Sequence, residues 1–186
     1  PKAEAVLSKE IADADLAELG YMRLREATWK GTPVFVSRLG YTGEDGFEIS
    51  IPADKAAGLW KALLAHKEVQ PIGLAARDSL RLEMGYPLYG HDLNEQTTPV
   101  EAGLGWVMGK EHTGFIGAEV ILPQRNSGVK TKRVGVKLTG AGIAREGSDI
   151  FLGAERIGTL TSGGFSPSLK ASIGQGYVAN DAAKEG

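Results

Sequence analysis

The sequence predicts an α+β fold in which antiparallel sheets and helices are followed by a small, all-β barrel or sandwich. Short stretches of alternating apolar and polar residues, separated by glycine turns, lie between residues 21 and 51 and again from residue 133 onward. Stretches between them carry apolar side chains at helical spacing. The 26 glycines among 186 residues are about twice the usual share, as expected for a chain with many turns.

Composition argues against several classes of function. The formal net charge of -2 gives no electrostatic basis for binding nucleic acid or an anionic membrane surface. No apolar run approaches the ~18 residues that a membrane-spanning helix needs. There is no cysteine, and His66, His91 and His112 lack the spacing of metal ligands and are expected on the surface. We therefore expect no nucleic acid partner, no membrane span and no metal site.

The first part of the chain is expected to mix helical and extended segments. The expected segments are a helix within 2–19, hairpin strands at 21–29 and 34–39, a strand at 47–51 and a helix at 53–66. The hairpin is expected to turn at Lys30–Pro33, and Gly40–Gly46 forms a glycine-rich loop before the third strand. Leu59 and Trp60 are both expected on the apolar face of the helix.

The middle of the chain contains a long polar loop between two helix signals. A helix is expected from Gly73 to Met84, where Gly85 stops it. Thr98-Pro99-Val100-Glu101 has the form of a capping box with proline at the first helical position, which predicts another helix start. The loop Gly85–Thr97 is longer than most loops in compact domains, so we expect it to be ordered and functional.

Beyond this loop the expected elements become mainly strands. Residues 114–124 suggest a short helix that ends before Pro123, and the polar residues 125–131 suggest a linker. The strands expected after the linker are 133–138, 149–152, 155–161 and 173–178, with a loop at Gly163–Lys170 before the last of them.

Glu48 is a candidate binding residue because it lies mid-strand, just after the Gly40–Gly46 loop. Its carboxylate could accept a pair of N–H donors, a pattern that the edge of a pterin or guanine offers. Alternation along the strand favours a different interpretation, a polar side chain that simply faces solvent. Tyr41 could stack on a planar ligand, or could equally well cover the hairpin.

Arg77 and Arg81 lie one helical turn apart in the expected helix, around Asp78. Spacing favours an intrahelical ion pair, although Arg77 could instead bind an anionic or carbonyl group of a ligand. Asp92 in the polar loop is expected to be a solvated turn residue. Ser166 is expected to be a turn residue and not a nucleophile, because no base is placed beside it.

Several long motifs resemble the glycine cleavage system T-protein family, the tetrahydrofolate-dependent aminomethyltransferases. They follow the family's order over nearly the whole chain: Arg38–Ser50, Gly73–Glu83, Leu88–Gly90, Thr97–Glu101, Ile157–Gly163, Ser166–Lys170 and Gly176–Val178. The resemblance implies the aminomethyltransferase folate-binding fold with a jelly-roll-like C-terminal barrel. It also implies three parts: 1–75, the later part of a first α+β domain; 76–130, the later part of a second, folate-channel domain; and 131–186, a truncated C-terminal β-barrel domain.

The resemblance also implies a one-carbon transfer. Family members take the aminomethyl group carried on the dihydrolipoyl arm of H-protein, release ammonia and leave 5,10-methylenetetrahydrofolate. We therefore expect tetrahydrofolate as the acceptor and the lipoyl-bearing H-protein as a partner. The expected location is the cytoplasm of a bacterium, or the mitochondrial matrix of a eukaryote.

Site residues are carried over position by position. Glu48 corresponds to the glutamate that holds the pterin ring, and Arg77 to the substrate-binding arginine of the G-L-x-A-R-D motif. Tyr41 corresponds to the tyrosine of G-Y-T-G-E. Tyr86 falls where some members have a folate-side tyrosine and others do not.

The family's catalytic aspartate is expected upstream of Pro1, so we expect no catalytic residue in this chain and no activity from the chain alone. Neither Asp45 nor Asp92 is expected to take that role. The alternatives are a folate-dependent demethylase and the folate module of a dimethylglycine or sarcosine dehydrogenase, which need a different one-carbon donor. A further alternative is a non-catalytic folate-binding protein of the same fold, which would lack the aspartate.

Overall fold

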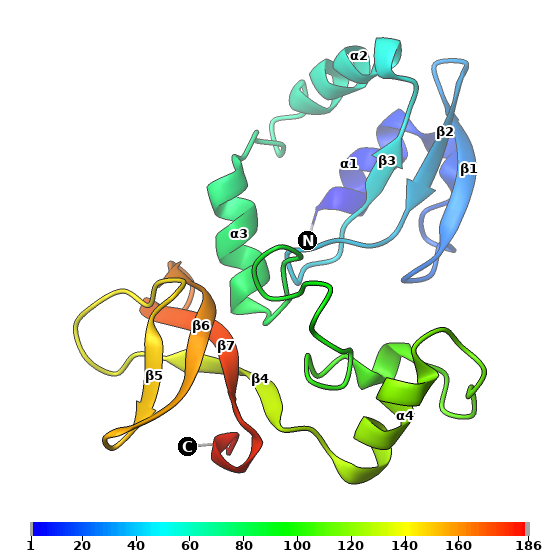
Figure 1. Cartoon of the computed structure of the whole chain (residues 1–186). Helices are drawn as coiled ribbons and strands as arrows, with labels where there is room; N and C mark the ends of the chain where they lie inside the picture. The colour runs from blue at the N-terminus through cyan, green and yellow to red at the C-terminus, as the bar shows by residue number, and fades with distance from the viewer. Residues whose placement is uncertain (1, 185–186) are drawn as a thin grey trace. The chain divides into compact units, whose positions relative to one another are not determined.

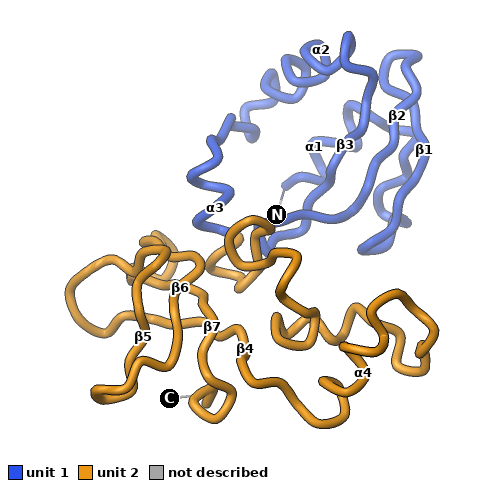
Figure 2. Tube along the Cα trace, in the orientation of Figure 1, with its two compact units in different colours: residues 1–80 blue, residues 81–186 orange. Residues whose placement is uncertain are grey.

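The structure is a computed structural model that describes residues 2–184. The chain forms two compact units, Pro1–Leu80 and Arg81–Gly186, which Figure 2 distinguishes by colour. The boundary falls within α3 (Leu74–Glu83), the helix expected at 73–84. Each unit contains an antiparallel sheet as well as helical residues, which confirms the α+β class. Among the described residues, no helix has both the length and the apolarity needed to cross a membrane.

The first unit is built on a three-stranded antiparallel sheet in the order β1–β2–β3 (Figure 1). Its elements are α1 (Ala3–Glu10), the 3-10 turn η1 (Ala12–Ala14), β1 (Leu24–Trp29), β2 (Thr32–Ser37), β3 (Glu48–Ser50) and α2 (Ala53–Leu64). Inward-facing residues of β1 and β2, among them Trp29 and Val36, form one buried cluster with apolar residues of α1 and η1. The sheet therefore has one covered face and one face open to solvent.

The hairpin between β1 and β2 turns at Lys30–Gly31, a shorter turn than the one expected. Both residues have positive φ, 47° and 79°, as a type I′ turn requires. Pro33 consequently lies inside β2. It is tolerated because its partner Thr28 donates its backbone N–H to Asp13 (3.1 Å), away from β2, and because β3 pairs only with the second half of β2.

One expectation about α2 is wrong. Leu59 is buried, but Trp60, expected on the same apolar face, is 55% exposed. Successive residues on a helix point about 100° apart, so a narrow contact with the core can bury one of them and leave the next outside.

The second unit is built on a four-stranded antiparallel sheet in the order β4–β7–β6–β5 (Figure 1). Its elements after α3 are the 3-10 turn η2 (Gly105–Val107), α4 (Ala118–Ser127), β4 (Thr131–Lys137), β5 (Asp149–Leu152), β6 (Glu155–Ser166), β7 (Ala171–Ala179) and the 3-10 turn η3 (Asn180–Ala182). Every strand expected in this part of the chain is present. The pairing of β6 with β7 shifts register between Leu160 and Ser162.

β6 runs on through Gly163 to Ser166, where a loop was expected. A Cβ on Gly163 would lie 2.5 Å from the backbone oxygen of Ala144, and a Cβ on Gly158 would lie 2.0 Å from that of Tyr177. Both distances are far shorter than van der Waals contact, so a side chain at either position would force the neighbouring backbone to shift. Gly163 therefore marks a close approach of two backbones and not a loop.

The helix expected to start at Thr98 does not form, and residues 99–103 make a turn instead. The two hydrogen bonds of the capping box do form. The Glu101 carboxylate accepts the backbone N–H of Thr98 at 3.0 Å, and the Thr98 hydroxyl accepts the backbone N–H of Glu101 at 3.2 Å. Gly103 then takes a φ of 71°, and the N–H of Leu104 donates to the carbonyl of Pro99 at 2.7 Å. This Schellman termination ends the turn before a helix develops.

Pro123, which was expected to end a helix, lies inside α4. It lacks the N–H that would bond to the carbonyl of Glu119, but Glu119 is exposed, so water can replace that partner. The helix continues through Ser127 and ends at Gly128, whose φ is 87°. The expected linker is therefore helical in its first part, and only residues 128–130 connect α4 to β4.

Candidate functional site

Glu48 begins β3, an edge strand of the sheet in the first unit, and its side chain is exposed. Its neighbours Phe47 and Ile49 pack against the buried cluster, so alternation places Glu48 on the open face. It pairs in register with Ser37, which pairs in turn with Leu24. No hydrogen bond or ion pair of the Glu48 carboxylate is found among residues 2–184, which leaves its oxygens accessible to a ligand.

The loop Gly40–Gly46 is held by Arg38, to which sequence analysis assigned no role. The Arg38 guanidinium donates to both carboxylate oxygens of Asp45, at 2.8 and 2.7 Å, and to the carboxylate of Glu4 at 2.8 Å. It also donates to the backbone carbonyls of Leu16 and Leu19, which follow η1, at 2.9 and 3.1 Å. The hydrogen bonds from Arg38 lower the pKa of Asp45. An arginine just before a glycine-rich loop and an aspartate near the end of that loop were the signal that could have revealed this anchor.

Tyr41 of this loop is half-buried and lies against Arg77 near the start of α3. The Arg77 Cζ atom is 4.9 Å from the centroid of the Tyr41 ring, within the range of a cation–π contact. Both residues belong to the same compact unit as Glu48. The fold therefore brings Tyr41 and Arg77 together from distant parts of the sequence, and it exposes Glu48 on the sheet of that same unit.

Asp92, which was expected to be a solvated turn residue, is only 1% exposed. Its carboxylate accepts hydrogen bonds from Arg81 Nη1 at 2.8 Å, from the Leu88 backbone N–H at 2.9 Å and from the Ser162 hydroxyl at 2.9 Å. The Thr161 hydroxyl donates to its other oxygen at 2.5 Å. Arg81 is 3% exposed, and the buried carboxylate of Asp92 is one of its partners. The solvated-turn interpretation of Asp92 is wrong.

Tyr86 is the second residue of the polar loop Gly85–Thr97 and belongs to the second unit. Its side chain is half-buried, and its backbone carbonyl accepts hydrogen bonds from Arg81 Nη1 at 3.3 Å and Gln175 Nε2 at 3.2 Å. The hydroxyl of Tyr177 in β7 donates to the backbone carbonyl of Asp92 at 2.8 Å, and burial raises the pKa of that hydroxyl. These bonds hold the loop on the sheet of its own unit, so the loop is ordered, as expected.

Ser166 is fully buried at the end of β6. Its hydroxyl donates to Glu83 Oε1 at 2.6 Å and accepts the backbone N–H of Leu169 at 2.9 Å. The bond from Ser166 lowers the pKa of Glu83. The Ser166 hydroxyl therefore caps a turn, as the sequence predicted, although the structure does place a carboxylate, that of Glu83, beside this buried hydroxyl.

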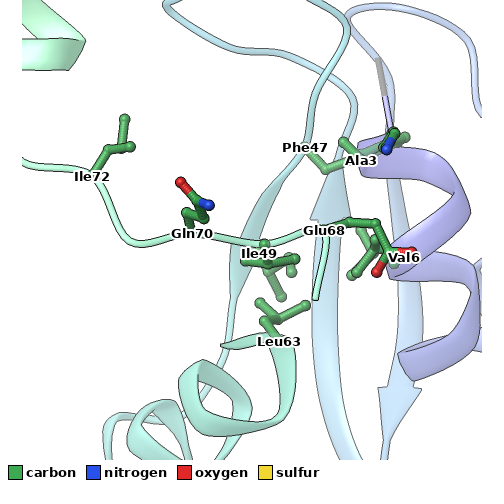
Figure 3. Close-up of a pocket in the computed structure, with 11 residues that line it drawn as sticks. Ala3, Val6, Phe47, Ile49, Leu63, Glu68, Gln70 and Ile72 are labelled. Carbon is green, nitrogen blue, oxygen red and sulfur yellow. The ribbon is translucent and has the colours of Figure 1, made fainter. Parts of the chain in front are cut away.

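The first unit also has an apolar hollow of about 670 Å³, shown in Figure 3. Val6 of α1, Phe47 and Ile49 around β3, and Leu63 of α2 line it. Glu48 lies between two of these residues but is not part of the lining, because alternation turns its side chain to the opposite face. The hollow and the Glu48 face are therefore separate features of this unit.

The histidines differ in their surroundings. His91 is exposed and lies 2.8 Å from Glu146 Oε2, as expected of a surface residue. The side chain of His66 is only 19% exposed and lies 2.7 Å from Glu10 Oε1, so the surface location expected for it is wrong. The hydrogen bond with His66 lowers the pKa of Glu10. Among the described residues, no group of three or more His, Cys, Asp or Glu side chains could hold a metal ion.

Two models of known protein domains match successive parts of the chain. Residues 1–112 match the GCVT N-terminal domain, and residues 131–186 match the glycine cleavage T-protein C-terminal barrel domain. The chain is 43% identical over 189 residues to an aminomethyltransferase of Halothermothrix orenii, which covers 100% of this chain and 53% of that protein. It is 48% identical over 183 residues to a mitochondrial aminomethyltransferase of Solanum tuberosum, with 96% of this chain and 45% of that protein covered.

A solved structure agrees with these matches. The crystal structure of glycine cleavage system aminomethyltransferase T from Bartonella henselae superposes with a TM-score of 0.87 at 41% identity, over 98% of this chain and 50% of that one. The chain thus spans about half the length of the relatives it matches. The C-terminal match agrees with the small barrel expected in the last part of the chain. With family matches over most of its length, the chain belongs to the glycine cleavage T-protein family.

Proposed function

We propose that the protein to which this chain belongs is a tetrahydrofolate-dependent aminomethyltransferase of the glycine cleavage system. It moves the one-carbon unit of an aminomethyl group to tetrahydrofolate and releases ammonia. The observation that carries this proposal is identity spread along the whole chain, 43% with one aminomethyltransferase and 48% with another. The names of these relatives favour the transferase over a demethylase or the folate module of a dehydrogenase.

Glu48 is proposed to hold the pterin ring of the folate. Its exposed carboxylate, without a partner among the described residues, can accept two N–H donors from the edge of a planar ring. Phe35 on the adjacent strand is 44% exposed, and the register places it opposite Ser50, on the same face as Glu48. An apolar ring beside a free carboxylate suits a ligand that is flat and carries polar groups on its edge.

Arg77 is proposed to bind an anionic or carbonyl group of the substrate, with Tyr41 beside it. Arg77 is exposed, so its N–H donors can reach a ligand. Tyr86 is proposed as a folate-side residue of the second unit. Asp45 and Asp92 are not proposed as the catalytic aspartate, since each is already engaged by an arginine: Asp45 by Arg38 and Asp92 by Arg81.

The intact protein is proposed to act with lipoyl-bearing H-protein, which delivers the aminomethyl group. The proposed organisation is 1–75 and 76–130 as the later parts of two α+β domains, with 131–186 in the C-terminal barrel. Its catalytic aspartate is proposed to lie in the part of the family fold that this chain does not include. Relatives from a bacterium and from plant mitochondria support either the bacterial cytoplasm or the mitochondrial matrix as the compartment.

Titration calorimetry of tetrahydrofolate into the intact protein tests this proposal. Glu48→Ala should leave pterin N–H donors unpaired and weaken binding by about 1–3 kcal/mol. Glu68→Ala is the matched control, because Glu68 is also exposed in the first unit but lies at the apolar hollow. The proposal fails if the intact protein does not bind tetrahydrofolate, or if Glu48→Ala binds it as tightly as the parent.

A further inference from the structure

We infer that Tyr41 is a positioning residue for Arg77, because its ring holds the guanidinium in place before the substrate arrives. The inference rests on the proposed function only for what Arg77 binds, since the contact between the two side chains is a property of the chain itself. It replaces the expectation that the ring of Tyr41 stacks on the ligand directly.

The contact joins the face of an aromatic ring to a cation. Arg77 Cζ lies 4.9 Å from the centroid of the Tyr41 ring. The Arg77 guanidinium has no hydrogen-bond partner among residues 2–184, so this ring is what restrains it in the described structure. An exposed arginine otherwise samples many rotamers, and ordering it on binding costs conformational entropy. A contact that exists before binding reduces that cost.

This contact leaves the chemistry of the guanidinium available. Its N–H donors lie in its plane, and an interaction with the ring uses its charge and not a donor. The donors remain free to form paired hydrogen bonds with a carboxylate or with a carbonyl group. The part of the ring that Arg77 covers is, in contrast, closed to a pterin, which is why we assign Tyr41 to Arg77 and not to the ligand.

The ring itself is carried by an anchored loop. Arg38 holds the far end of the loop through both oxygens of Asp45, at 2.8 and 2.7 Å, and connects it to the segment after η1 through two backbone carbonyls. Arg77 is carried by α3, where its backbone N–H donates to Gly73 at 3.4 Å. The pair thus joins an anchored loop to the first turn of a helix, which is the arrangement that positioning requires.

A double-mutant cycle on the intact protein tests the inference, with tetrahydrofolate affinity from titration calorimetry as the readout. Arg77→Ala should weaken binding about tenfold or more, because a charged donor is lost. Tyr41→Leu should raise the Kd about two- to fivefold, the value of an exposed cation–π contact, while Tyr41→Phe keeps the ring and stays near the parent. In the Arg77→Ala background, Tyr41→Leu should have no further effect. Tyr21→Leu, which removes a 69% exposed tyrosine of the same unit, is the control and should change nothing.

A second measurement detects the contact between Tyr41 and Arg77 in the absence of folate. The Nε–Hε resonance of Arg77, observed by NMR in the intact protein, should show a ring-current shift in the parent and in Tyr41→Phe, and should lose it in Tyr41→Leu.

Two results would overturn the inference: an equal loss of affinity from Tyr41→Leu in both backgrounds, or an Arg77 resonance that Tyr41→Leu leaves unchanged. If Arg77→Ala binds tetrahydrofolate as tightly as the parent, the role proposed for Arg77 in binding fails instead, and the NMR result still decides the contact.

Discussion

The buried ion pair of the second unit makes the sharpest stability prediction. Asp92→Ala removes a carboxylate that is 1% exposed and accepts four hydrogen bonds, from Arg81, Leu88, Ser162 and Thr161. The loss is expected to destabilise the unit far more than an average substitution does.

The magnitude follows from which donors can find new partners. The hydroxyl of Thr161 already lies 3.3 Å from the backbone carbonyl of Gln175, and a hydroxyl can rotate toward such an acceptor. The charge of Arg81 cannot be relieved in this way, because the residue is only 3% exposed. Breaking a buried pair by removing one partner costs about 3–5 kcal/mol, and we expect Asp92→Ala to fall in this range.

Equilibrium urea unfolding followed by circular dichroism measures the loss, and hydrogen exchange of β6 and β7 amides assigns it to the second unit. Asp149→Ala is the matched control, since the Asp149–Arg156 pair lies in the same unit but its side chains are 44% and 57% exposed. An exposed pair contributes about 0–1 kcal/mol. The combined substitution Arg81→Met with Asp92→Leu should be more stable than Asp92→Ala, because it removes both charges of the buried pair. A loss for Asp92→Ala as small as that for Asp149→Ala would refute the reasoning.

Two further predictions concern the sheet and the N-terminal helix. Gly158→Ala should lower the free energy of unfolding by about 1–3 kcal/mol, measured by thermal unfolding, because the added Cβ would lie 2.0 Å from the backbone oxygen of Tyr177. Gly135→Ala is the control and should lower the free energy of unfolding clearly less, because no atom lies within 4 Å of its added Cβ. Equal losses for the two substitutions would contradict the packing argument. The hydrogen bond with His66 lowers the pKa of Glu10 below its usual 4.5, so this carboxylate contributes stability above pH 4.5 that is lost as the pH falls through its folded-state pKa. The stability difference between the parent and Glu10→Gln should accordingly be largest above that pH and shrink below it, and a difference that does not change across acid unfolding would contradict this assignment.

Elements whose signals are local could be predicted closely. α3 begins and ends within one residue of the helix expected from the spacing of its apolar residues and from the glycine that stops it. The order of the strands along the chain followed from alternation and glycine turns. Where local signals compete, the prediction failed: the capping box at Thr98 forms, but Gly103 ends the turn that follows it before a helix develops.

For the candidate site, too, the sequence predicted the features that depend on neighbouring residues and not the contacts between distant ones. Alternation was sufficient to place Glu48 on the open face of its sheet, since neighbouring residues of a strand point to opposite sides. The resemblance of long motifs to a known family suggested Tyr41 and Arg77 as candidate site residues, but no sequence pattern showed that the two side chains touch. Nor did any pattern show that Arg38 anchors the loop that carries Tyr41.

The sequence by itself determined the fold class, the approximate strands and helices, and the family, because periodicity, capping and contiguous motifs are properties of neighbouring residues. Only the tertiary structure decided which polar side chains are buried and what they bind. In the sequence Asp92 lies in a polar loop, but in the structure its carboxylate accepts hydrogen bonds from Ser162 and Thr161 of β6, a strand distant along the chain. Its burial depends on the packing of those segments, and once water is excluded, every charge must find a partner within the protein.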